Sequence, residues 1–227
     1  MKRGFTLAEV LITLGIIGVV AAMTIPVITQ KIDKQTTVSK LQKSFAALHE
    51  IIKLSEKDNG EVWEWDWENV VYGSDFIESD FFKKYFAPYI KVIGNYGGGS
   101  YRIYTIDGVY CTSLDSWIVL PDGSAFGIFN NSGVGNTNPG GGGYLWIFID
   151  INGKNKPNRI GKDIFMAEIV RKKRLVMWGS SSKNRDSLIT DRVGYSCKKG
   201  TSQQYGGGYC GALIQMDGWQ IKDDYPW

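Results

Sequence analysis

A single carboxylate lies inside the most apolar stretch of the sequence. Between Phe5 and Ile28 the only ionisable side chain is that of Glu9. A carboxylate at the centre of a membrane span costs about 2.5–3.5 kcal/mol, so Glu9 needs either a position near the lipid headgroups or a compensating cation. If the chain is cut between Gly4 and Phe5, the new amino group of Phe5 lies one helical turn from Glu9. The two charges can then pair on one helix or across two adjacent helices.

The apolar stretch has the length and flanks of a membrane span. At about 1.5 Å per residue, a helix from Phe5 to Ile28 crosses a hydrocarbon core of about 30 Å. Lys2 and Arg3 precede it, and this basic leader is expected to stay in the cytoplasm. A conventional secretory signal places a small-residue cleavage site after the apolar run, and Ala21-Ala22-Met23 matches such a site poorly. Cleavage before the run is the better interpretation.

The string Gly4-Phe5-Thr6-Leu7-Ala8-Glu9, with its basic leader and unbroken apolar continuation, resembles the type IV prepilin signal of type IV pilins and type II secretion pseudopilins. The resemblance implies that a prepilin peptidase cuts after Gly4 and that Phe5 becomes an N-methylated terminus. It also implies that Glu9 neutralises the Phe5 amino group of a neighbouring subunit during assembly. Pro26 matches a proline common in such helices, where it bends or locally melts the span because proline removes a backbone donor and clashes with the preceding turn.

The next segment, residues 29–57, is predicted to continue the helix with one apolar face. Its apolar residues recur at three- and four-residue steps, at Ile32, Val38, Leu41, Phe45, Leu48, Ile51, Ile52 and Leu54. Asp58-Asn59-Gly60 supply stop signals. We therefore expect a basic leader at 1–4, a transmembrane or filament-core helix at 5–28, the amphipathic continuation at 29–57 and a globular β-rich head at 58–227.

The head has the pattern of antiparallel strands joined by turns, with a short helix at Ser79–Tyr89 that ends near Pro88. The predicted strands are Tyr101–Ile106, Val109–Cys111, Trp117–Leu120, Ala125–Phe129, Tyr144–Ile151 and Ile164–Val170. After Gly179 the sequence is loop-like, except for a last short element at Ala212–Met216. A long helix followed by an antiparallel sheet is an α+β fold. This is the pilin-like arrangement, in which a long N-terminal helix with a membrane-spanning first half packs on a C-terminal antiparallel β-sheet head.

Three cysteines cannot all pair within one chain. Cys197 and Cys210 enclose a loop rich in Gly, Lys and Gln, which has little apolar content to fix it. In an exported protein a disulfide would close this loop, whereas three reduced thiols are the alternative. Cys111 is expected to be a free thiol in or beside a strand.

Trp63, Trp65 and Trp67 alternate with acidic residues. A period of two predicts a short strand or extended segment with one aromatic face. Such a face could be a platform for a glycan or a partner, or the three rings could simply pack against the head.

The loop from Asp150 to Asp163 is rich in oxygen ligands, and Asp150, Asn152 and Asp163 are its candidate calcium ligands. Some major pseudopilins bind calcium in a loop between late strands, and this loop resembles theirs in placement. Its spacing departs from an EF-hand, and four basic residues, Lys154, Lys156, Arg159 and Lys162, would repel a divalent ion. The alternative is a solvated Asn-Gly turn. Calcium is the one cofactor that the sequence suggests.

The composition excludes several functional classes. A net charge of +3 without a basic stripe gives no indication of nucleic-acid binding. The single histidine, His49, excludes a multi-histidine metal site, and no catalytic constellation or phosphate-binding loop is present. An envelope-anchored enzyme is therefore the least favoured hypothesis.

The leading hypothesis is a pilin or pseudopilin, a structural subunit that is not an enzyme. It would be a single-pass protein of the cytoplasmic membrane, with its head outside the cytoplasm, that assembles into a filament. Its partners would be copies of itself or related pilins, the prepilin peptidase, an assembly platform and the membrane. The alternative is a minor pilin or anchored binding module whose aromatic head binds a glycan or another surface ligand.

Overall fold

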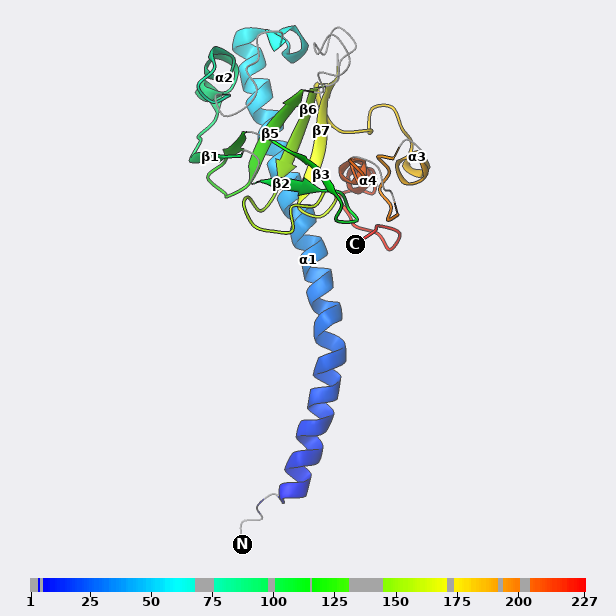
Figure 1. The fold of residues 1–227 in the computed structure, drawn as a ribbon. Coiled ribbons are helices and arrows are strands. Elements are labelled where there is room, and N and C mark those ends of the chain that lie inside the picture. The colour runs from blue at the N-terminus through cyan, green and yellow to red at the C-terminus, as the bar shows by residue number, and fades with distance from the viewer. Residues whose placement is uncertain are drawn as a thin grey trace. The chain divides into compact units, whose positions relative to one another are not determined.

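The computed structural model describes Gly4 and residues 6–67, 76–97, 101–114, 116–130, 145–170, 174–191, 194–200 and 205–227. It divides into two compact units, Met1–Thr36 and Thr37–Trp227. The long helix α1 (Leu7–Asn59) supplies the described helix of the first unit and the opening segment of the second. The architecture is α+β, with this N-terminal helix followed by an antiparallel sheet (Figure 1), so the predicted fold class is confirmed.

The apolar side chains of α1 in the first unit are exposed. Leu7 is 77% exposed, Ile12 63% and Met23 71%. By length and composition, α1 is the one helix in the described residues that could cross a membrane, and its most apolar stretch is entirely unburied. The helix is continuous across Pro26, so the structure has no melted turn there. Because proline lacks an N–H group, the carbonyl of Ala22 loses its usual helical donor.

In the second unit, α1 is amphipathic and contributes to the core. Its buried apolar residues belong to the same hydrophobic cluster as the sheet, and they are Val38, Leu41, Phe45, Leu48, Ile51 and Ile52. The periodicity prediction is wrong for Ile32 and Leu54, which are 54% and 42% exposed. The helix ends as predicted, because Gly60 has a φ of 78° and donates its N–H to the carbonyl of Glu56.

The main sheet has six described strands, and all neighbouring pairs are antiparallel. Its order is β1-β4-β5-β6-β7-β8, and β2 pairs with β3 in a separate two-stranded sheet. The strands are β1 (Gly94–Tyr96), β2 (Arg102–Tyr104), β3 (Tyr110–Ser113), β4 (Trp117–Val119), β5 (Ala125–Asn130), β6 (Leu145–Asp150), β7 (Ile164–Val170) and β8 (Arg174–Met177).

Short helices complete the second unit. They are the 3₁₀ turns η1 (Val62–Glu64) and η3 (Ala87–Tyr89) and the α-helices α2 (Asp80–Tyr85), α3 (Arg185–Thr190) and α4 (Cys210–Met216). The helix predicted near Pro88 is α2, which is followed by the 3₁₀ turn that contains this proline. Three elements that the sequence did not predict are β1, β8 and α3. The strands β1 and β8 are short and are defined by their pairing with β4 and β7, whereas α3 is a six-residue helix capped by Asn184.

The centre of the core is β7, whose residues are buried from Ile164 to Ile169. Helix α4 packs closely on this part of the sheet. A side chain at Gly211 would lie 3.0 Å from the sulfur of Met177 and 3.6 Å from the ring of Phe165. The absence of a side chain at this position therefore allows the close approach of helix and sheet.

The tryptophan segment is not a strand, which corrects the sequence prediction. Trp63 lies in the η1 turn, and Trp65 and Trp67 are only 2% and 1% exposed. The Trp65 ring stacks on Tyr85 at 4.6 Å, and the Trp67 indole N–H donates to the carbonyl of Val62. The alternation reflects a turn that buries two rings, so these rings cannot form a binding platform.

Cys197 and Cys210 are joined by a disulfide, with an S–S distance of 2.00 Å. Both residues are fully buried. Cys111 is a free, buried thiol in β3, as expected. The disulfide ties the start of α4 to the loop after α3.

Removal of this disulfide should destabilise the protein by about 3 kcal/mol, because closing a loop of this length restricts the unfolded chain by that amount. The measurement is urea unfolding of the wild type and of a Cys197→Ala, Cys210→Ala double variant, each with and without reductant. Reductant should shift only the wild-type midpoint. An unchanged wild-type curve under full reduction would contradict the stabilising role.

Candidate functional site

The N-terminal end of α1 is closed by a reciprocal cap between Thr6 and Glu9. The Thr6 backbone N–H and hydroxyl each donate to Glu9 Oε2 at 2.8 Å, and the Glu9 N–H donates to the Thr6 hydroxyl oxygen at 3.3 Å. Because α1 begins at Leu7, this is a capping box, with Thr6 at the N-cap position and Glu9 three residues on. Phe5 lies outside the described residues, and Gly4 is exposed.

The cap survives the predicted cut, because the Thr6 amide remains an amide when Phe5 becomes the terminus. A carboxylate in the first turn is also stabilised by the helix dipole. Only Oε2 of Glu9 takes part in the cap. Oε1 is therefore the oxygen that a neighbouring amino group can reach without opening the cap.

A second polar site lies in the head, around the buried carboxylate of Asp150 at the end of β6. The hydroxyls of Tyr101 and Tyr96 both donate to Asp150 Oδ2, the latter at 3.1 Å. The backbone N–H of Asn152 donates to Oδ1 at 3.0 Å. Asp150 itself is fully buried.

Asp163 organises the other end of the same loop. Its carboxylate accepts hydrogen bonds from the backbone N–H groups of Asn158 and Arg159 at 2.7 and 2.6 Å. The Asn152 side-chain amide donates to it at 3.3 Å. Asn152 thus bonds to both aspartates, and the β6–β7 loop folds around two inward-facing carboxylates.

Burial raises the pKa of Asp150 to about 7, although the Tyr101 and Asn152 donors oppose this shift. Burial also raises the pKa of Asp163. The same desolvation, with the Asp150 charge next to it, raises the pKa of both Tyr96 and Tyr101. Asp150 therefore changes its protonation state near neutral pH, well above the range of an ordinary aspartate.

The predicted calcium ligands are brought together, but the arrangement does not fit an ion. Both oxygens of Asp150 and both oxygens of Asp163 already accept hydrogen bonds from protein donors. Calcium requires six to eight oxygens, and the described residues contain no group of three or more His, Cys, Asp or Glu side chains placed to hold a metal. Among the side-chain oxygens of the three predicted ligands, only the buried Oδ1 of Asn152 has no hydrogen-bond partner.

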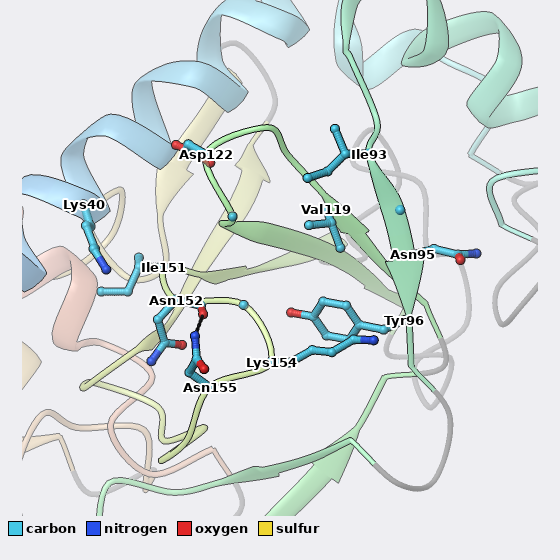
Figure 2. Close-up of a pocket in the computed structure, with 13 residues that line it drawn as sticks. Lys40, Ile93, Asn95, Tyr96, Val119, Asp122, Ile151, Asn152, Lys154 and Asn155 are labelled. Atoms are coloured by element: carbon cyan, nitrogen blue, oxygen red, sulfur yellow. Dashed lines mark hydrogen bonds between the residues drawn. The ribbon is translucent and has the colours of Figure 1, made fainter.

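A pocket of about 480 Å³ adjoins this cluster, between the edge strand β1 and the β6–β7 loop. Figure 2 shows Tyr96 and Lys154 on one side of it and Lys40 of α1 on the other. The Lys154 ammonium lies 5.1 Å from the centre of the Tyr96 ring. The lining has no histidine or cysteine, and its one carboxylate, Asp122, is paired with Lys43 at 3.0 Å. Such a lining can hold a polar group but offers no activated nucleophile.

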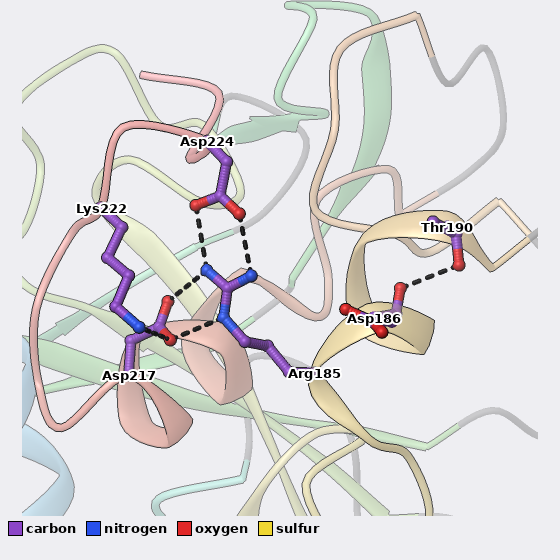
Figure 3. A network of polar contacts seen from close by, with 6 residues as sticks. All are labelled: Arg185, Asp186, Thr190, Asp217, Lys222 and Asp224. Atoms are coloured by element: carbon purple, nitrogen blue, oxygen red, sulfur yellow. Dashed lines mark hydrogen bonds and ion pairs between the residues drawn. The ribbon is translucent and has the colours of Figure 1, made fainter.

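An ion network joins α3, α4 and the C-terminal segment (Figure 3). The Arg185 guanidinium binds Asp217 through two bonds of 2.7 and 2.8 Å and Asp224 through two of 2.8 and 3.0 Å. Lys222 adds a bond of 2.6 Å to Asp217, whose side chain is only 3% exposed. These donors lower the pKa of Asp217, with Arg185 the main cause.

Two family models match the chain. A family of unknown function, DUF6613, matches residues 27–227. The chain belongs to the DUF6613 family. The prokaryotic N-terminal methylation motif matches residues 1–25, in front of the family region. Searches of the curated proteins and of the solved structures returned no match.

The methylation motif confirms the resemblance stated above. This DUF6613 protein begins with a type IV pilin and pseudopilin prepilin signal, followed by the apolar helix and the antiparallel sheet that such proteins share. The motif supports a subunit of the pilin or pseudopilin kind. It also supports membrane anchoring and assembly with other pilins in general terms.

Several functional contacts were not predicted from the sequence. The Thr-x-x-Glu spacing at Thr6 is a capping-box signature and could have been found. The tyrosine partners of Asp150 could not, because Tyr96 in β1 and Tyr101 just before β2 are far from it in sequence. The partners of Arg185 are also distant in sequence, at the end of α4 and in the C-terminal segment.

The raised pKa of Asp150 predicts a stability that falls as the pH rises from about 4 to about 7. In this range the folded state binds more protons at this site than the unfolded state, so the free energy of unfolding decreases with pH. An Asp150→Asn variant, which resembles the protonated acid, should lose this slope. Thermal unfolding of the detergent-solubilised protein between pH 5 and pH 8, with and without calcium, measures it. Equal slopes in the two proteins would contradict the assignment.

The Arg185 network predicts the opposite pH dependence. Carboxyls with a lowered pKa stabilise the fold above their unfolded pKa, and this contribution is lost as the pH falls through the folded value. Arg185→Leu should destabilise the protein by about 2 kcal/mol at neutral pH, because it removes the charge-assisted hydrogen bonds to Asp217 and leaves Lys222 as its remaining cation. The matched control is Asp224→Asn at the exposed end of the network, which should cost less. Urea unfolding at pH 7 and pH 3 compares them, and an equal loss at both pH values would contradict the model.

Proposed function

We propose that this protein is a structural subunit of a type IV pilus or a type II secretion pseudopilus. A prepilin peptidase processes it between Gly4 and Phe5, and the mature protein assembles through its N-terminal helix. The observation that carries the proposal is the bare apolar surface of α1 from Leu7 to Ile32, directly behind a prepilin signal.

That surface needs an apolar partner. A contiguous exposed apolar surface of this extent marks a membrane or protein interface rather than a solvated one. Before assembly the bilayer covers it, because residues 5–28 are long enough to span the hydrocarbon core. In the filament, the same segments of neighbouring copies or related pilins replace the lipid.

Glu9 is the one acidic residue on this surface, and it provides the assembly contact. We expect its carboxylate to pair with the amino group of Phe5 on a neighbouring subunit. The capping box supports this role because it orients the side chain at the first turn through Oε2. Loss of either partner of such a pair in an apolar environment is strongly destabilising, because it leaves the other charge buried and unpaired.

The head lies outside the cytoplasm. The Lys2-Arg3 leader favours a cytoplasmic N-terminus, which puts everything after the span on the other side. The Cys197–Cys210 disulfide supports this orientation, since disulfides persist in oxidising compartments. The partners are then other pilins, the peptidase and an assembly platform. The role is structural and not enzymatic.

The binding-module alternative loses its main residues. Trp65 and Trp67 are core side chains, and Trp63 is half-buried beside them. Pili and pseudopili share the subunit role proposed here.

N-terminal mass spectrometry of the membrane-extracted protein, with and without a co-expressed prepilin peptidase, tests the processing step. We expect a mature chain that begins at Phe5 and is heavier by one methyl group. An intact Met1, or a cut after Ala22 or beyond, would exclude the proposal.

Two matched variants separate the charge of Glu9 from its capping bonds. Glu9→Gln keeps an oxygen that can accept from Thr6 but removes the charge, whereas Thr6→Ala removes the side-chain part of the cap and keeps the charge. We expect the peptidase to process both variants. Glu9→Gln should reduce the yield of sheared filaments at least tenfold, because it leaves the Phe5 amino group of the neighbouring subunit buried without a counter-charge. Thr6→Ala should reduce it far less. Normal filament yield from Glu9→Gln would show that the charge is not used.

A further inference from the structure

The head carries a second pocket, of about 470 Å³, whose lining is cationic. Arg102 of β2 and Lys156 and Arg159 of the β6–β7 loop contribute the charges, and Tyr104 contributes an aromatic wall. None of its lining residues is acidic. The size is typical of a site that receives a side chain or a small polar group.

In the parts of the chain that the structure describes, no ion pair joins Arg102, Lys156 or Arg159 to a carboxylate. Two acids beside lining residues of the pocket accept other hydrogen bonds. Asp163 accepts hydrogen bonds from backbone N–H groups, and both oxygens of Asp107 accept from the Gly200 N–H.

The positive charge extends beyond the pocket. Burial of Lys162, together with the charges of Arg159 and Lys199, lowers the pKa of Lys162. We call Arg102, Lys156, Arg159, Lys162 and Lys199 the basic surface.

An acidic surface lies at the opposite end of the same compact unit. It surrounds the end of α1 and the η1 turn, and its exposed members are Asp58, Glu61, Glu64 and Asp66. In Figure 1 the C-terminal end of α1 lies at one end of the sheet, and β2 and the β6–β7 loop lie at the other. The hydroxyl of Tyr89 already donates to Asp58 at 2.8 Å. Glu61 and Glu64 are exposed acids at the start and end of the η1 turn.

We propose that the basic surface of one subunit receives the acidic η1 turn of the next copy along the filament. The proposal rests on the subunit function proposed above. Copies inserted in a membrane by the same signal share one orientation, so copies stacked along a filament meet end to end. Such a contact is heterologous and needs two different, complementary surfaces on each subunit, and the two oppositely charged ends of the head meet this need.

A second copy fits better than a free anion. The acidic turn is present in every subunit at the concentration of the filament itself, and its two exposed carboxylates match a pocket with several cations. An open, repeating contact of this kind also propagates without limit, whereas a contact between identical patches closes at a dimer.

Charge reversal tests the pairing in full-length protein produced with its peptidase and assembly machinery. One variant combines Arg102→Glu with Arg159→Glu, a second combines Glu61→Lys with Glu64→Lys, and a third carries all four changes. Each one-sided reversal should reduce the yield of sheared filaments about tenfold or more through like-charge repulsion. The four-fold variant should recover most of the yield. Lys91→Glu, an exposed reversal outside both surfaces, is the matched control and should leave the yield unchanged.

Cysteine cross-linking gives an independent readout that does not depend on filament yield. With Glu64→Cys and Lys156→Cys in one chain, oxidation of intact filaments should produce a ladder of multimers, whereas either change alone should not. Normal yields from both one-sided reversals, no recovery in the four-fold variant, or the absence of a ladder would overturn the pairing. If the wild type is processed and forms filaments but these pairing tests fail, only this inference is overturned. A wild type that is not processed or forms no filaments overturns the proposed function as well.

Discussion

The structure depends on how one helix distributes its apolar surface. From Leu7 to Ile32 the large side chains of α1 are exposed, and from Val38 onwards one face enters the core of the head. Burial of apolar area is the dominant favourable term in folding. The head obtains it within the chain, whereas the large apolar side chains of the N-terminal segment stay exposed. The boundary between the two units lies at Thr36.

The head uses buried polar groups to shape the loop that sequence patterns leave open. Two inward-facing aspartates, Asp150 and Asp163, draw backbone and side-chain donors around them, and so define the path between β6 and β7. The cost of burying Asp150 is expressed in its raised pKa rather than in an unpaired charge. The basic residues of the same loop face outwards as a result. The carboxylate oxygens of both aspartates thus take part in hydrogen bonds within the loop and its neighbours.

Several elements follow from local sequence because their signals are local. The apolar run, the prepilin string around Glu9 and the Gly60 stop all act over a few residues, and the structure and the methylation motif agree with them. The strands near Trp117, Ala125 and Ile164 were also predicted from local sequence, and the structure contains them. The tryptophan prediction failed because a period of two does not distinguish a strand from a turn that buries alternate rings.

The sequence by itself determined the membrane-length helix, the processing signal and the α+β class, since hydrophobic length and short motifs need no long-range contact. Only the tertiary structure decided the strand order, the burial of Trp65 and Trp67 and the partners of Asp150. It also decided that Arg102 and Arg159 share one pocket while Glu61 and Glu64 lie at the other end of the head. These facts depend on contacts between residues far apart in the chain, and such pairings are chosen by the packing of the whole core and not by any local pattern.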